Sequence, residues 1–303
     1  MFESFLASTV AMTTPILLAA LGELLVENSG VLNVGIEGAM LSGAFFGFAA
    51  AWFSGSIIIG MLGAVAAGVA LNAILAILVV NLAVNQVVAG TALDIFALGL
   101  TGVAYRRIFG VTGQAVTVHA LGPLALGPLA RLPLIGRPLF DQNPLGYLAF
   151  ALVPILGYGL RRTRYGLRIR AVGERPEAAD ALGLRVFRLR WTMILIAGAL
   201  AGLGGAYLTL AYANTFVEGI SNGRGFVALS VVIVGRWRAW GVAAASLLFG
   251  AAIAMQFTLQ AAGTAIPYQC FLATPYLLTL LVLAVVGGQA RAPGALGEPY
   301  RRP

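Results

Sequence analysis

Residues 161–190 read RRTRYGLRIRAVGERPEAADALGLRVFRLR and separate two long apolar runs. The stretch holds nine of the nineteen basic residues and three acidic residues, so it carries +6 of the chain's net charge of +8. An arginine at the centre of a bilayer costs about 2.5–3.5 kcal/mol, which excludes a stretch with nine of them from the lipid. Because short positive loops stay in the cytoplasm, this stretch predicts a cytoplasmic loop that orients the whole chain.

A short helix is predicted inside this loop. Pro176 suits the first position of a helix, and Gly183 suits the residue just past its end. The residues between them have one apolar face and one acidic face. The apolar face is formed by Ala178, Ala181 and Leu182, and the acidic face by Glu177 and Asp180. Such a helix can dock into a cleft of a soluble partner, and the alternative is a solvated loop with no partner.

The composition is that of a membrane protein. The chain is 60% hydrophobic and 10% charged, with a mean hydropathy of +0.92, whereas soluble domains contain about 25% charged residues. At about 20 residues per span, a chain of this length allows roughly eight to ten membrane helices. We therefore predict an all-α polytopic bundle that forms one transmembrane domain over residues 1–303, with its cytoplasmic loop at 161–190.

Several kinds of site are excluded or not expected. The only cysteine is Cys270 and the only histidine is His119, so no intrachain disulfide can form and no metal site or cofactor is expected. The chain has no lysine, which excludes ATP binding through a Walker A motif and argues against an enzyme. We attribute the basic pI of about 10.2 to arginines near the membrane, and expect no nucleic-acid partner.

Apolar runs predict the membrane-spanning helices. The runs are 5–26, 40–53, 57–80, 81–105, 144–160, 191–213, 241–259 and 267–286. A further run at 226–234 is too short to cross as a straight helix, so it predicts a partial or re-entrant helix or one that borrows flanking residues. Counting about nine crossings from the arginine-rich loop puts the N-terminus outside and the C-terminus inside.

Polar residues interrupt these apolar runs. Residues 28–38 read NSGVLNVGIEG, which predicts either an unwound segment beside a transport pathway or an ordinary interfacial turn. Asp94 lies near the middle of a predicted span, where an acid marks either a pathway or a structural pair. Glu23 and Glu27 are interpreted as the end of the first helix at the membrane interface.

Four stretches together resemble a known family. They are ENSGVLNVGIEGAMLSGAF (27–45), NQVVAGTALDIFALGLTG (85–102), GLRIRAVGERPEAADALGL (166–184) and GISNGRGFVALSVVIVGRW (219–237). In this order they resemble the permease subunits of bacterial ABC importers of the simple-sugar and nucleoside type, which include ribose and branched-chain amino acid permeases. The first and third stretches are most similar to the nucleoside branch.

The resemblance implies a type II importer permease fold in the bacterial plasma membrane. It implies a working complex with two ATP-binding cassette ATPase subunits, a second permease that is the same or a related chain, and an extracytoplasmic solute-binding protein. The helix at 176–182 would be the coupling helix on the ATPase, and this chain would supply no catalytic residue. The implied coupling residues are Glu174, Pro176, Glu177, Ala178, Asp180, Ala181, Leu182 and Gly183.

A nucleoside needs hydrogen bonds to its ribose hydroxyls and base edges, which carboxamides and carboxylates could supply. We therefore expect five polar residues to line the pathway, namely Asn33, Glu37, Asn85, Gln86 and Asp94. Three alternatives stay open: the same importer class with a simple sugar, a branched-chain amino acid or another small solute, an ion-coupled secondary transporter that uses Asp94, and a membrane enzyme.

Overall fold

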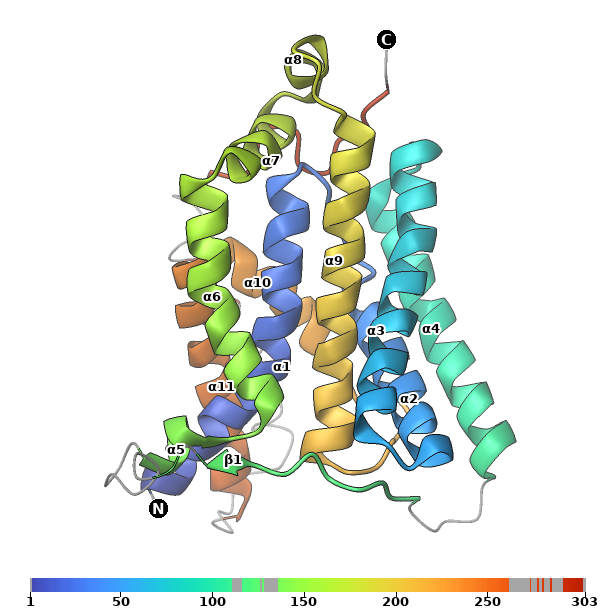
Figure 1. Cartoon of the computed structure of the whole chain (residues 1–303), viewed down its shortest axis with the longest axis vertical. Coiled ribbons are helices and arrows are strands. Elements are labelled where there is room, and N and C mark those ends of the chain that lie inside the picture. Colours follow the sequence, from blue (N-terminus) through green and yellow to red (C-terminus); the bar gives the residue numbers. More distant parts are fainter. Residues whose placement is uncertain are drawn as a thin grey trace.

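The computed structural model describes residues 2–110, 116–125, 127, 136–261, 273, 277, 280, 284 and 291–301. Long helices run side by side along the long axis of the molecule, and the N-terminus lies at the end opposite helices α7 and α8 (Figure 1). In this part of the chain, seven helices are long and apolar enough to cross a membrane. The predicted all-α membrane bundle is therefore confirmed. The run at 267–286 lies outside the described residues except at 273, 277, 280 and 284, so the predicted total of spans stays a prediction.

The long helices are α1 (Phe2–Asn28), α2 (Ile36–Ser54), α3 (Ile57–Ala76), α4 (Gln86–Phe109), α6 (Pro144–Arg162), α9 (Val186–Ala206) and α11 (Ala239–Ala261). Shorter helices are α5 (Gly136–Phe140), α7 (Arg164–Glu174), α8 (Pro176–Ala181) and α10 (Arg224–Val234). Helix α3 continues into a π-helical segment at Ile77–Asn81, and α9 continues into another at Tyr207–Tyr212. The strands Leu124–Ala125 (β1) and Asp141–Gln142 (β2) form one short antiparallel pair.

Helix α1 lies at the centre of the bundle, and apolar side chains on all of its sides are buried. Ile16, Leu17, Leu18 and Leu21 have no exposed surface, and α1 packs against α6, α9, α10 and α11. By contrast, α3, α4 and α6 present apolar side chains outward, as they would toward lipid or another membrane chain.

Glycines allow α2, α3 and α9 to approach closely. A Cβ added to Gly43 would lie 2.4 Å from the Cα of Gly202, and one added to Gly68 would lie 2.1 Å from the carbonyl oxygen of Gly198. Backbones that meet at such distances leave no room for a methyl group, which is how small residues stabilise helix pairs in membranes.

Two predicted boundaries change. The span expected at 81–105 begins at Gln86, because Asn85 caps α4 and the preceding residues end the α3 column. The arginine-rich stretch 161–190 is mostly helical, because α6 continues to Arg162 and α9 already begins at Val186. Helices therefore extend beyond the apolar runs that predicted them. The short run at 226–234 is confirmed as a short helix, α10.

Candidate functional site: the coupling end and the unwound segment

The short helix predicted inside the arginine-rich stretch is present as α8. Pro176 occupies its first turn, and Gly183 follows it with a φ of +83°, a conformation that favours glycine. The side chains of Ala178 and Ala181 are exposed, and Leu182 is 85% exposed. The fold therefore leaves apolar surface on α8, which projects beyond the long helices (Figure 1).

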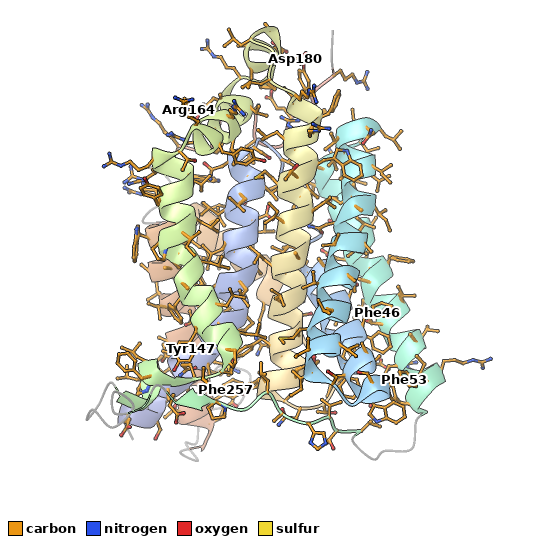
Figure 2. The ribbon with its side chains drawn as sticks, in the orientation of Figure 1. Phe46, Phe53, Tyr147, Arg164, Asp180 and Phe257 are labelled. Carbon is orange, nitrogen blue, oxygen red and sulfur yellow. The ribbon has the colours of Figure 1, made fainter. Side chains whose placement is uncertain are left out.

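The acidic residues of this end face in different directions. Glu177 is exposed. Asp180, labelled in Figure 2, accepts a hydrogen bond on Oδ2 from the Tyr300 hydroxyl at 3.1 Å. Glu174 accepts a hydrogen bond on Oε2 from the backbone N–H of Gly294 at 3.2 Å. Glu174 and Asp180 therefore hold the C-terminal residues, while Glu177 and the apolar face remain accessible.

Helix α7 connects α8 to the bundle by packing against the end of α1. Its start is capped by Thr163, whose Oγ1 accepts a hydrogen bond from the N–H of Gly166 at 3.1 Å. Val172 is fully buried, and a Cβ added to Gly173 would lie 2.2 Å from the carbonyl oxygen of Asn28. Because backbone meets backbone here, α7 and the end of α1 form one close-packed contact.

The unwound segment after α1 runs alongside the start of α4. The N–H of Leu32 donates to Oε1 of Gln86 at 2.7 Å. A Cβ added to Gly90 would lie 2.6 Å from the backbone nitrogen of Gly35. The break predicted within residues 28–38 falls between the end of α1 at Asn28 and the start of α2 at Ile36, and it packs against protein.

Glu37 and Asp94 each bind a helix N-terminus. Oδ1 of Asp94 accepts a hydrogen bond from the N–H of Gly38, in the first turn of α2, at 2.6 Å. Glu37 accepts hydrogen bonds from the N–H groups of Gly223 at 2.8 Å and Gly225 at 2.6 Å, at the start of α10. A negative charge is stabilised there by free N–H groups and the helix dipole. Asp94 thus has a backbone partner in α2, and its place in a pathway stays a prediction.

Asn33 and Asn85 occupy unlike surroundings. Asn33 is fully buried, and its backbone N–H donates to Oε1 of Glu23 at 3.0 Å. Asn85 is exposed, and its Oδ1 accepts hydrogen bonds from the N–H groups of Val87 at 3.0 Å and Val88 at 3.1 Å. Asn85 therefore caps α4, a local role that Asn commonly has at a helix start.

Glu23 and Glu27, which the sequence assigned to the membrane interface, are buried in the bundle with exposed fractions of 0% and 1%. Glu23 accepts the hydrogen bond from Asn33, and Oε2 of Glu27 accepts one from the indole N–H of Trp237. Their spacing of four residues could have indicated a shared buried face. Their partners come from elsewhere in the chain, and Trp237 lies 210 residues from Glu27.

Residues 291–301, to which the sequence assigned no role, contact α7 and α8 on one side and the start of α9 on the other. Arg190 is only 1% exposed. Its Nε donates to the carbonyl oxygen of Ser29 at 3.2 Å, and its guanidinium lies 5.8 Å from the centre of the Tyr300 ring. One arginine of the cationic stretch is therefore buried inside protein rather than solvated.

At the opposite end of α4, Arg106 forms a bidentate ion pair with Glu218, at 2.7 Å from Nε and 2.6 Å from the terminal nitrogen. This hydrogen-bonded pair holds the pKa of Glu218 below its ordinary value. Among the described residues, no three or more His, Cys, Asp or Glu side chains gather as a metal site would require. His119 is exposed, and Cys270 lies outside the described residues.

Comparisons with known proteins bear on this arrangement. A family model described as "Branched-chain amino acid transport system / permease component" matches residues 5–287. The nucleoside ABC transporter permease protein NupC of Lactococcus lactis is 35% identical, over 98% of this chain and 96% of that protein. The guanosine ABC transporter permease protein NupQ of Bacillus subtilis is 34% identical, over 97% and 95%.

A third relative carries a different cargo in its name. TsgC13 of Haloferax volcanii, provisionally named as a glucose ABC transporter permease, is 35% identical over 98% of this chain and 97% of its own length. A solved structure described as an inward-facing conformation of a provisionally named metal-chelate type ABC transporter has a TM-score of 0.50. It covers 93% of this chain and 85% of its own, and at 18% identity it shows the fold alone.

Proposed function

Because this chain belongs to the family of branched-chain amino acid transport system permease components, we propose that it is the membrane subunit of an ATP-driven importer of nucleosides. It is a multi-pass transport subunit and not an enzyme. ATP hydrolysis belongs to a separate ATPase in importers of this class. The two relatives named for nucleoside and guanosine transport support a nucleoside as cargo.

A simple sugar is the second candidate cargo. The relative named for glucose is 35% identical, the same value as for the relative named for nucleosides. The percentages of sequence identity therefore do not distinguish the two cargoes. Both cargoes carry hydroxyl groups that need hydrogen-bond donors and acceptors along the pathway. A nucleoside adds a flat base whose edges need further hydrogen bonds.

The coupling role rests chiefly on the exposed face formed by α8 and by Leu182, the residue that directly follows it. Leu182 is 85% exposed at the tip of the molecule, where an unpartnered apolar side chain stands among charged residues. A cleft on a soluble ATPase would cover this face, with Ala178 and Ala181 on the same surface. Force applied to α8 would pass through α7 to the end of α1, because Gly173 packs directly on Asn28.

The pathway lies, in this proposal, near the contact between the unwound segment and α4. This placement is supported by the buried polar groups of Asn33, Gln86 and Asp94. A movement of α1 relative to α4 would alter that contact, which is the kind of change that alternates access in transporters with broken helices. Asn85 and Glu37 would stabilise the helices beside this pathway, because Asn85 caps α4 and Glu37 binds the N-terminus of α10.

The orientation follows from the charge of the loop. Nine arginines at 161–190 favour a cytoplasmic position for α7 and α8. The N-terminus, at the other end of the bundle (Figure 1), would then face outward, where a solute-binding protein would deliver the cargo. A second permease, identical or related, would cover part of the apolar outer surface of this chain within the plasma membrane.

Uptake by the complete complex in vesicles tests the cargo. The complex is supplied with ATP and offered radiolabelled guanosine and glucose in separate assays. We expect ATP-dependent guanosine uptake that does not require an ion gradient. Uptake of glucose but not guanosine would contradict the nucleoside assignment and favour a sugar as the cargo. Uptake driven by an ion gradient without ATP would contradict the assignment to ATP-driven importers.

Asp94→Asn tests the pathway in the same assay. The variant keeps an amide oxygen that can accept the hydrogen bond from Gly38, so we expect the unfolding temperature to change little while uptake falls. Normal uptake with normal substrate preference would remove Asp94 from the pathway.

Association with the ATPase tests the coupling face. Leu182→Arg places a charge on the apolar surface of α8, and we expect it to reduce recovery of the ATPase in a pull-down. Val217→Arg is the matched control, because Val217 is also exposed (58%) but lies before α10 rather than on α8. Equal recovery from both variants would reject the docking role of α8.

A further inference from the structure

The C-terminal strap, residues 291–301, is built into the coupling end. Its backbone follows the end of α7: the N–H of Ala295 donates to the carbonyl oxygen of Gly173 at 2.9 Å, and the N–H of Gly294 donates to Oε2 of Glu174. Tyr300 then reaches α8 through its hydroxyl, which donates to Asp180. The strap therefore contacts both α7 and α8 by hydrogen bonds.

The strap is also attached to the membrane helices. The Tyr300 ring lies 5.8 Å from the ring of Phe187 and 5.8 Å from the guanidinium of Arg190, both at the start of α9. Tyr300 is only 6% exposed. A cation beside an aromatic ring is attracted more strongly when both are shielded from water, as they are here.

A third attachment leads to the unwound segment. Nε2 of Gln86 donates to the carbonyl oxygen of Glu298 at 3.4 Å, while Oε1 of the same side chain accepts the hydrogen bond from Leu32. In addition, a Cβ added to Gly30 would lie 3.3 Å from the carbonyl oxygen of Ala295. One amide side chain thus joins the strap, the unwound segment and α4.

We propose that residues 291–301 are a mechanical strap that couples α8 to the membrane helices, with Tyr300 as its positioning residue on α8 and Gln86 as its link to the unwound segment. The proposal rests on the proposed function, because it assumes that an ATPase moves α8. It adds a second route for that movement, beside the direct contact of α7 with α1. This route enters the bundle at α4 and the unwound segment, where the proposed pathway lies.

The chemistry of Tyr300 explains why this residue is suited to the task. Its hydroxyl binds a carboxylate on α8 while its ring packs on an arginine of α9, so one rigid side chain spans two elements. Phenylalanine at this position would keep the ring contact and lose the hydrogen bond to Asp180. Tyr300→Phe therefore separates the coupling contact from the packing of the strap.

The test uses the complete complex with Tyr300→Phe and with Tyr158→Phe as its matched control. Tyr158 is a 67% exposed tyrosine on α6. Two quantities are measured: hydrogen exchange of the α8 amides, and the amount of cargo imported per ATP hydrolysed. We expect Tyr300→Phe to exchange α8 amides about tenfold faster, the size of losing one hydrogen bond to a charged group, and to import less per ATP.

A merely structural role for Tyr300 would raise the exchange rate and leave import per ATP unchanged, and that result overturns the proposal. Unchanged exchange would overturn it as well. The proposed docking of the ATPase on α8, on which the strap depends, fails separately when Leu182→Arg and the Val217→Arg control recover equal amounts of ATPase. If Leu182→Arg abolishes recovery and Tyr300→Phe leaves import per ATP at the control value, only the strap is rejected.

Discussion

Glu37 offers a quantitative test of how the short helix α10 is held. Its carboxylate accepts hydrogen bonds from Gly223 at 2.8 Å and Gly225 at 2.6 Å. A hydrogen bond to a charged group contributes about 1.5–3 kcal/mol. Glu37→Gln keeps one oxygen acceptor but turns an amide donor toward the other N–H group. Because Glu37 is half-buried, we expect a loss near the lower bound, about 1.5–2 kcal/mol.

Glu37→Ala removes both hydrogen bonds, so its loss should be about twice as large, roughly 3–4 kcal/mol. For a chain of this size, the Gln variant should lower the unfolding temperature by about 3–6 °C. The assay is thermal unfolding of the purified permease in detergent, with Glu177→Gln as the control because Glu177 is exposed on α8. If Gln, Ala and control variants unfold at one temperature, then Glu37 does not hold α10.

The other predictions concern packing and charge. Gly68→Ala should lower the unfolding temperature clearly, because its Cβ would lie 2.1 Å from the Gly198 carbonyl oxygen, whereas Gly99→Ala in α4 meets nothing within 4 Å and should not. Equal effects from the two changes would contradict the close helix contact. The lowered pKa of Glu218 means that its pair with Arg106 stabilises the fold above the ordinary glutamate pKa and loses this contribution as pH falls through the lowered value. Arg106→Ala should therefore reduce the dependence of the unfolding temperature on acidic pH, and an unchanged dependence would refute this assignment.

Local signals in the sequence were sufficient where the structure depends on local chemistry. Pro176 and Gly183 correctly predicted where α8 begins and ends. The ring of Pro176 fixes its own φ at a helical value, and Gly183 adopts the positive φ that ends the helix, so neither effect depends on distant residues. The glycines at the contacts of α2, α3 and α9 act equally locally, since only the missing side chain lets these backbones meet.

Contacts between distant residues could not be predicted in the same way. The burial of Arg190 depends on Tyr300, and the bond to Asp180 joins residues 120 positions apart. Nothing in the composition of residues 291–301 indicates that they pack on α7. For Asp94, the sequence predicted either a pathway or a paired contact. The structure shows its hydrogen bond with the N–H of Gly38, and the pathway role stays a prediction.

The central claim is that α8 is the surface on which a separate ATPase acts. A photo-reactive amino acid placed at position 182, in the complete complex, tests this contact directly. Leu182 is 85% exposed, so the probe can be introduced without disturbing the core. We predict a cross-link to the ATPase that changes in yield when ATP is bound. A probe at 182 that labels only lipid or the extracytoplasmic binding protein would contradict the account.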